Sequence, residues 1–122
     1  MKALSITLLL ILISLNTMAQ VQQTFIYEIT LYERFRHQSS WSETEHEIQK
    51  KHIEYLAALT KSGSLQLAGI TNQGLEDHTG FIILTTESYE KANSIAQNDP
   101  SVKEGMMSVK LKPVNIYFKK EN

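Results

Sequence analysis

The chain has 122 residues and no cysteine, and its 12 basic and 13 acidic side chains give a formal net charge of -1. The lack of cysteine excludes thiol catalysis, thiolate metal sites and disulfide bonds. The balanced charge provides no excess of basic residues to bind nucleic acid or an anionic membrane. The length suits one domain with one core.

Residues 1–19 predict a secretory signal peptide. They combine a positive start, an apolar run over residues 8–13 and small residues just before Gln20. A membrane anchor is the alternative, but the apolar run falls short of the about 20 residues that a spanning helix needs. We therefore expect a domain over residues 20–122 that is exported, periplasmic or extracellular, and free of the membrane after cleavage.

The first elements of the mature chain are a strand and a long helix. Aromatic and β-branched side chains alternate with polar ones over residues 24–32, which predicts a strand, and residues 33–41 form a polar loop. A helix begins at Ser42, because the sequence SETE has the form of a capping box, and it ends at the C-terminal cap Gly63. Trp41 stands where a staple residue packs on the first helical turn.

His52 lies inside the apolar stripe of this helix. Winding the helix at about 100° per residue places it among Ile48, Ile53, Tyr55, Leu56 and Leu59. An ionisable group aimed at a core is costly unless it is paired. A lone buried histidine is more often a hydrogen-bonded core residue than a functional one, so both interpretations stay open.

A hairpin follows the helix. Residues 64–70 predict a short strand, and the turn at 72–74 leads toward a second strand over 81–86. The near-continuous apolar run of that second strand indicates a central strand covered on both faces.

A second helix, capped by Thr86 or Ser88, runs to about residue 98. Asp99 would project from its apolar arc if the helix reached that far. Asp99 followed by Pro100 is also an ordinary way to cap a short turn, so capping alone would explain it.

A final strand is predicted over residues 107–118, with Pro113 marking a bulge, an edge or a break. The complete order is β-α-β-β-α-β, the α+β class with a ferredoxin-like arrangement and both helices on one sheet face. The other face also needs cover, and two protomers packed sheet to sheet as a homodimer would provide it.

An imidazole held by a carboxylate is suited to acid–base chemistry. It titrates near about 6.5 in model peptides, and a carboxylate that accepts its second N–H selects the tautomer. A pair of His52 and Asp99 would serve proton abstraction in elimination, isomerisation or tautomerisation, and it lacks the nucleophile that acyl transfer needs. Tyr27, Trp41 and Tyr55 are candidate pocket walls for a small ligand or substrate.

Several motifs, in their order and spacing, resemble the YCII-related domain family. They are His52-x-x-Tyr55-Leu56, Gly63-Ser64-Leu65, Ala68-Gly69, Gly80-Phe81-Ile82-Ile83-Leu84, Tyr89-Glu90-Lys91-Ala92 and Asp99-Pro100-x-Val102-x-x-Gly105. The resemblance covers about residues 25–118. It implies a dimeric α+β barrel of ferredoxin-like protomers with an active site formed by a His and an Asp, roles that fall on His52 and Asp99.

The resemblance also implies small-molecule lyase or dehalogenase-like chemistry on hydroxylated aromatic or similar compounds in some members. This chain departs from the family at Ile70, where members often have proline, and at Ser101, where they often have an aromatic residue. We therefore expect a pocket that differs from those of its relatives in shape and substrate.

Two classes of function remain. The first is an exported small-molecule enzyme, of lyase, isomerase or dehalogenase-like type, that uses His52 and Asp99. The second is a non-catalytic module of the same fold that binds a small ligand or a partner. No cofactor motif is present, and His37, His46 and His78, with Glu45, are expected to be solvated rather than metal ligands.

Overall fold

The structure is a computed structural model that describes residues 21–122. The predicted signal peptide lies outside the described residues. Within the described part of the chain, no helix has the combination of length and apolarity that crossing a membrane requires.

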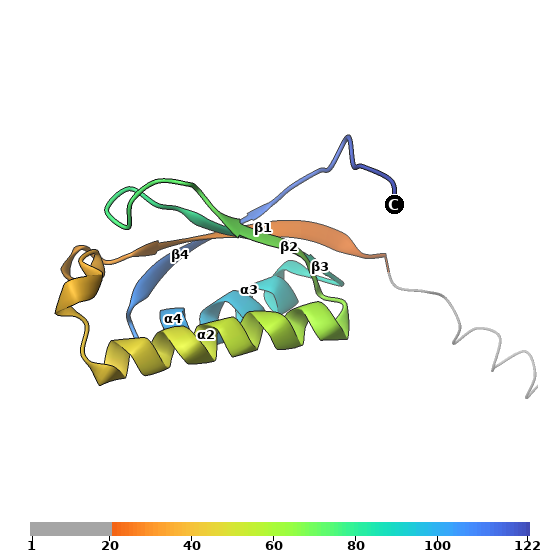
Figure 1. The fold of residues 1–122 in the computed structure, drawn as a ribbon. Coiled ribbons are helices and arrows are strands. Elements are labelled where there is room, and N and C mark those ends of the chain that lie inside the picture. The colour runs from red at the N-terminus through yellow and green to blue at the C-terminus, as the bar shows by residue number, and fades with distance from the viewer. Residues whose placement is uncertain (1–20) are drawn as a thin grey trace, which may run out of the picture.

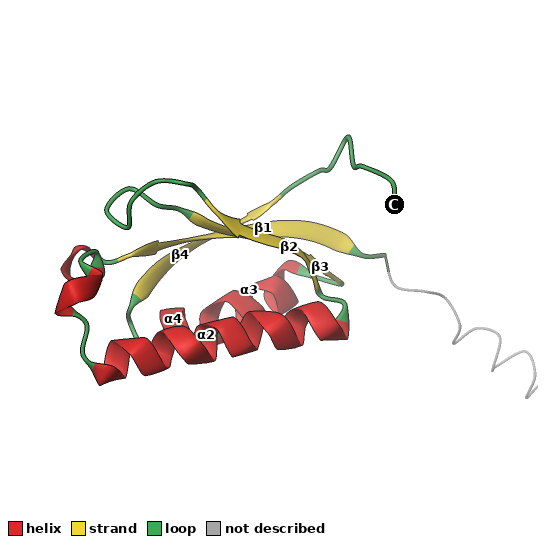
Figure 2. Cartoon of the chain, in the orientation of Figure 1, coloured by secondary structure: helices red, strands yellow, loops and turns green. Residues whose placement is uncertain are grey.

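The described chain folds into two layers, with one four-stranded sheet and the helices on one of its faces (Figures 1 and 2). The strands are antiparallel and lie in the order β2-β3-β1-β4. This arrangement confirms the predicted α+β class with ferredoxin-like order. The elements are β1 (Gln23–Leu31), η1 (Glu33–Phe35), η2 (Gln38–Ser40), α2 (Glu43–Ser62), β2 (Leu65–Ile70), β3 (Gly80–Thr86), α3 (Tyr89–Asn98), α4 (Pro100–Lys103) and β4 (Met107–Pro113).

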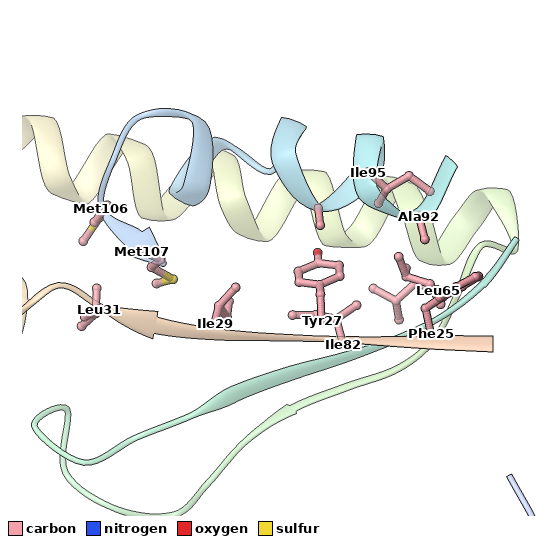
Figure 3. Close-up of a cluster of buried hydrophobic side chains, with 12 residues drawn as sticks. Phe25, Tyr27, Ile29, Leu31, Leu65, Ile82, Ala92, Ile95, Met106 and Met107 are labelled. Atoms are coloured by element: carbon pink, nitrogen blue, oxygen red, sulfur yellow. The ribbon is translucent and has the colours of Figure 1, made fainter. Parts of the chain in front are cut away.

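The core lies between the helices and the sheet. Alternate side chains of β1 point toward the helices and are buried there, namely Phe25, Tyr27, Ile29 and Leu31 (Figure 3). Met106 and Met107 close the same core at the start of β4. The period-two pattern of β1 therefore predicted its buried face correctly.

The start and end of α2 follow the predicted signals. The backbone N–H of Ser42 donates to Glu45 Oε2 at 2.8 Å, and Gly63 caps the C-terminus with a φ of 89°. Hydrogen bonds from Ser42 lower the pKa of Glu45 below its usual value. The rings of Trp41 and His46 pack edge to face with centroids 5.4 Å apart, which confirms the staple.

Only one face of β3 is covered by the described protomer. Its side chains alternate between buried and half-buried, so cover on both faces is not seen within residues 21–122. Ile26, Ile83 and Phe81 lie on the half-buried face, which carries no helix.

The final strand is shorter than predicted and ends at Pro113 rather than near residue 118. Pro113 pairs with Phe25, and one further hydrogen bond joins Val114 N–H to the carbonyl of Thr24. β4 is an edge strand, and its last residue is Pro113, where the sequence predicted a bulge, an edge or a break.

Candidate functional site

Two helical segments bring His52 and Asp99 together. His52 lies in the middle of α2, which packs against α4. Asp99 lies between α3 and α4 with a φ of -57° and a ψ of 124°, because a residue before proline is driven out of the helical region. α3 therefore stops at Asn98, and Asp99 caps α4 by accepting from Ser101 N–H while its side chain remains in the core.

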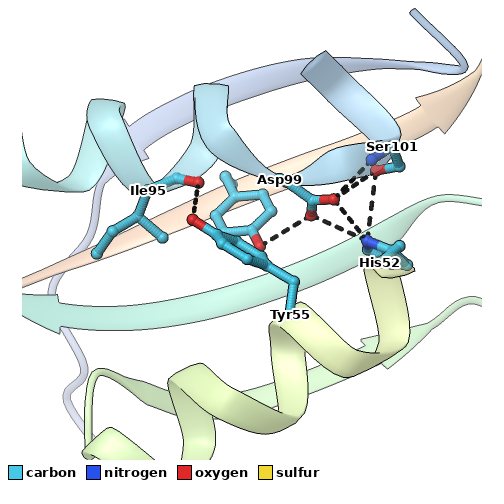
Figure 4. A network of polar contacts seen from close by, with 6 residues as sticks. His52, Tyr55, Ile95, Asp99 and Ser101 are labelled. Carbon is cyan, nitrogen blue, oxygen red and sulfur yellow. Dashed lines mark hydrogen bonds and ion pairs between the residues drawn. The ribbon is translucent and has the colours of Figure 1, made fainter. Parts of the chain in front are cut away.

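The carboxylate of Asp99 holds one nitrogen of the His52 ring (Figure 4). Nδ1 lies 2.7 Å from Oδ1 and 2.9 Å from Oδ2, and the two side chains are 6% and 0% exposed. An ionised carboxylate only accepts hydrogen bonds, so Nδ1 carries the hydrogen. In the neutral ring Nε2 then has a free lone pair, which is the tautomer that a general base needs.

Two further residues surround Asp99 with donors. Ser101 donates its backbone N–H and its hydroxyl to Oδ1 at 3.0 and 2.8 Å, and Tyr27 donates its hydroxyl to Oδ2 at 3.2 Å. The Ser101 oxygen also lies 3.3 Å from His52 Nδ1, where it can accept. The serine that departs from the family pattern is thus part of the buried polar cluster, defined as His52, Asp99, Ser101 and Tyr27.

Burial raises the pKa of the Tyr27 hydroxyl far above its usual value, and the charge of Asp99 raises it further. Tyr27 therefore stays a hydrogen-bond donor throughout the neutral range. Burial and then Asp99 also raise the pKa of Tyr55, whose hydroxyl donates to the Ile95 carbonyl at 2.8 Å.

His52 also lines a cleft of about 310 Å³. Its wall is mostly apolar and comes from all four strands, from α2 and the segment just before it, and from the loop between β2 and β3. The lining residues are Ile29, Leu31, Trp41, Gln49, His52, Ile53, Leu56, Ala68, Gly69, Ile70, Leu75, His78, Gly80, Ile82 and Met107. His52 is in the cleft wall and its Nδ1 is turned toward Asp99, so Nε2 is the ring nitrogen left to meet a ligand in the cleft.

Of the three aromatic residues proposed as pocket walls, the structure places Trp41 on the cleft, where its indole N–H is fixed by the Phe35 carbonyl at 2.7 Å. Tyr27 and Tyr55 do not line the cleft. Their hydroxyls donate instead to Asp99 and to the Ile95 carbonyl, respectively. Ile70, the second departure from the family pattern, does lie on the cleft wall.

The expectation that His78 is solvated is wrong. It is 6% exposed, and its Nδ1 lies 2.8 Å from the Leu75 carbonyl, so the loop between β2 and β3 carries both residues into the cleft wall. No periodic pattern marks a loop residue in advance. Among residues 21–122, no three His, Asp or Glu side chains are grouped to hold a metal ion.

Gln49 was also missed, although a signal was present. It lies three residues before His52 and so shares its face of α2. Its Oε1 is buried and has no hydrogen-bond partner among the described residues.

Comparison with known proteins gives a family and a fold. The family model described as YCII-related domain matches residues 27–115. No curated protein matches the chain in sequence.

Two solved structures are similar to the chain. One is the 5-chloro-2-hydroxyhydroquinone dehydrochlorinase of Burkholderia phenoliruptrix in complex with 2,5-dihydroxybenzoquinone, with a TM-score of 0.56, 21% identity, and 75% of this chain and 93% of that chain covered. The other is an uncharacterised protein of Thermotoga maritima, with a TM-score of 0.51, 14% identity, and 78% and 100% covered. At these identities the likeness establishes the fold alone.

Proposed function

The chain belongs to the YCII-related domain family, and on this premise we propose that it is an exported small-molecule enzyme in which His52 is the general acid–base. Asp99 is its positioning residue, since it fixes the tautomer and the ring orientation. The observation that carries the proposal is the ring of His52, which is held at Nδ1 by Asp99 and lies in the wall of an apolar cleft.

The proton transfers are simple. Nε2 takes a proton from an acidic C–H or O–H of the substrate, and the imidazolium that forms stays hydrogen-bonded to Asp99. In a tautomerisation or isomerisation the same proton returns to another atom of the same molecule. In an elimination the leaving group departs with its bonding electron pair, so a chlorinated substrate loses one proton and one chloride.

The similar dehydrochlorinase supports a substrate with a small hydroxylated ring and a leaving group, because its name and its ligand are of that kind. The cleft is at the small end of ligand pockets, which usually run from about 300 to 1,000 Å³. A single-ring compound is therefore the substrate size that we propose.

Chloride release from 5-chloro-2-hydroxyhydroquinone, measured anaerobically by ion chromatography, tests the proposal. The wild type should release chloride faster than buffer, and His52→Gln should lower the rate about 10²-fold to 10⁴-fold. His37→Gln is the matched control, because its side chain is 68% exposed and outside the cleft. A His52→Gln variant that is folded and as fast as the wild type would contradict the role given to His52.

The second candidate is a non-catalytic module that binds a small ligand in the same cleft, which its apolar wall favours. Calorimetric titration with 2,5-dihydroxybenzoquinone separates the two. An enzyme should keep most of its affinity in His52→Gln while losing turnover. Binding by a wild type that turns over none of the chlorinated hydroxyquinols would favour the module instead.

We also propose a homodimer that buries the face of the sheet without helices. Ile26, Phe81 and Ile83 on that face are half-buried, and Leu67 is exposed. Sedimentation equilibrium should give a dimer for the wild type and a monomer for Ile83→Asp, because a charge in the centre of the interface would be desolvated without a partner. A monomeric wild type at micromolar concentration would contradict this assembly.

A further inference from the structure

We propose that Gln49 and His78 are specificity residues of the His52 cleft, and that they select ligands by accepting hydrogen bonds from hydroxyl groups. The inference rests on the proposed function only in taking this cleft as the ligand site. It adds two residues from different elements, the helix α2 and the loop between β2 and β3.

Gln49 carries an acceptor that the described protein leaves unused. Its Oε1 is buried and has no hydrogen-bond partner among residues 21–122, and its side chain lines the cleft. A buried polar atom without a partner costs about 1–3 kcal/mol. A turn of the side-chain amide would bring Oε1 to the cleft surface, where a hydroxyl donor from a ligand would remove that cost. A ligand with such a group would then gain affinity that an apolar one of the same shape does not.

His78 offers a second acceptor. A carbonyl can only accept, so the 2.8 Å contact with the Leu75 carbonyl places the hydrogen on Nδ1. In the neutral ring Nε2 is then a lone-pair acceptor, and the described residues give it no hydrogen bond. His78 lines the cleft and also a second pocket of about 270 Å³ beside it, and a ligand in the cleft is the partner that we propose for Nε2.

The same reasoning applies to Nε2 of His52, whose Nδ1 donates to Asp99. The cleft thus presents acceptors from three side chains, His52, Gln49 and His78, on a wall that is otherwise almost entirely apolar. The complementary ligand is a compact apolar ring that carries more than one hydroxyl donor. A ligand rich in acceptors, such as a carboxylate, would face these groups unfavourably.

Binding of 1,2,4-trihydroxybenzene and of 1,2,4-trifluorobenzene, measured by anaerobic NMR titration, tests the inference. The two probes have similar size, but fluorine donates no hydrogen bond. The wild type should prefer the hydroxylated probe. Gln49→Leu should reduce this preference about 2-fold to 10-fold, because it removes one neutral hydrogen bond. Gln97→Leu is the control, since Gln97 is exposed on α3.

Two substitutions divide the roles of the His78 ring. His78→Asn keeps a donor near the position of Nδ1 for the Leu75 carbonyl and removes Nε2, so it should reduce the preference by a similar factor. His78→Gln places an amide near the position of Nε2 and should keep most of the preference. A purely structural histidine would give the reverse order.

The inference is overturned if the wild type binds both probes equally or neither, or if Gln49→Leu and His78→Asn leave the preference unchanged. Because only binding is measured, these results are separate from the chloride-release test of His52. Loss of turnover in His52→Gln with unchanged selectivity in the Gln49 and His78 variants would keep the proposed function and reject the further inference.

Discussion

Polar side chains meet on both faces of the sheet, but under different conditions. Between the helices and the sheet, Asp99 accepts hydrogen bonds from His52, Ser101 and Tyr27 in a buried cluster. On the other face, Lys112 Nζ lies 3.2 Å from Glu28 Oε1 in a solvent-exposed pair.

A buried charge needs all of its hydrogen-bond partners, because they must offset the cost of removing it from water. A charge pair on the surface contributes little to the free energy of unfolding. Apolar residues of similar size could fill a buried polar site at no loss of stability. The buried polar cluster therefore supports the role proposed for His52, since folding alone does not require it.

The largest difference should appear when one partner of each pair is removed. Asp99→Ala leaves the buried donors of His52 and Tyr27 without their acceptor, and we expect it to lower the free energy of unfolding by about 3–5 kcal/mol. Glu28→Ala should lower it by about 1 kcal/mol or less. Urea denaturation measures both, and equal effects would mean that the buried cluster is not held as described.

Removing the hydroxyl of Tyr27 should have an intermediate effect on stability, and this effect should depend on pH. Its pKa is raised in the folded protein, so its stabilisation is complete below the unfolded value near about 10 and is lost as the pH rises beyond it. The wild type should therefore lose stability above about pH 10 more steeply than Tyr27→Phe. Thermal melting between neutral and alkaline pH measures this difference, and parallel curves would argue against a buried, protonated Tyr27.

The smallest effect on stability is expected from a substitution at the exposed start of α2. The pKa of Glu45 is lowered by hydrogen bonds from Ser42, so its contribution is present at neutral pH and is lost as the pH falls through its folded value. Glu45→Gln should flatten this acid dependence slightly. Melting temperatures at neutral and acidic pH provide the measurement, and an unchanged slope would mean that the capping box does not persist in solution.

Helical periodicity made the central features of the site predictable. His52 was placed in a buried stripe because residues about three and four apart share a helix face, and the Asp-Pro sequence indicated a cap at Asp99. The same period places Gln49 on the face of α2 that carries His52.

Other features depended on contacts between distant segments. Tyr27 was predicted as a pocket wall, but it lies in the core, and its hydrogen bond to Asp99 joins residues 72 positions apart and requires the packing of α3 on β1. His78 lies in a loop, where no repeating pattern distinguishes a buried side chain from a solvated one. The end of β4 at Pro113 was one of three possibilities for this proline, and the apolar pattern that continues to residue 118 did not choose among them.

The tautomer of His52 is the most direct test of the central claim. Nitrogen-15 NMR of imidazole-labelled protein, with the His52 signals assigned by their loss in His52→Gln, distinguishes a protonated ring nitrogen from one with a lone pair. We predict that the neutral ring of the wild type carries its hydrogen on Nδ1, toward Asp99, and a lone pair on Nε2, toward the cleft. A hydrogen on Nε2 in the neutral ring would contradict the account, because that nitrogen could then not act as the base.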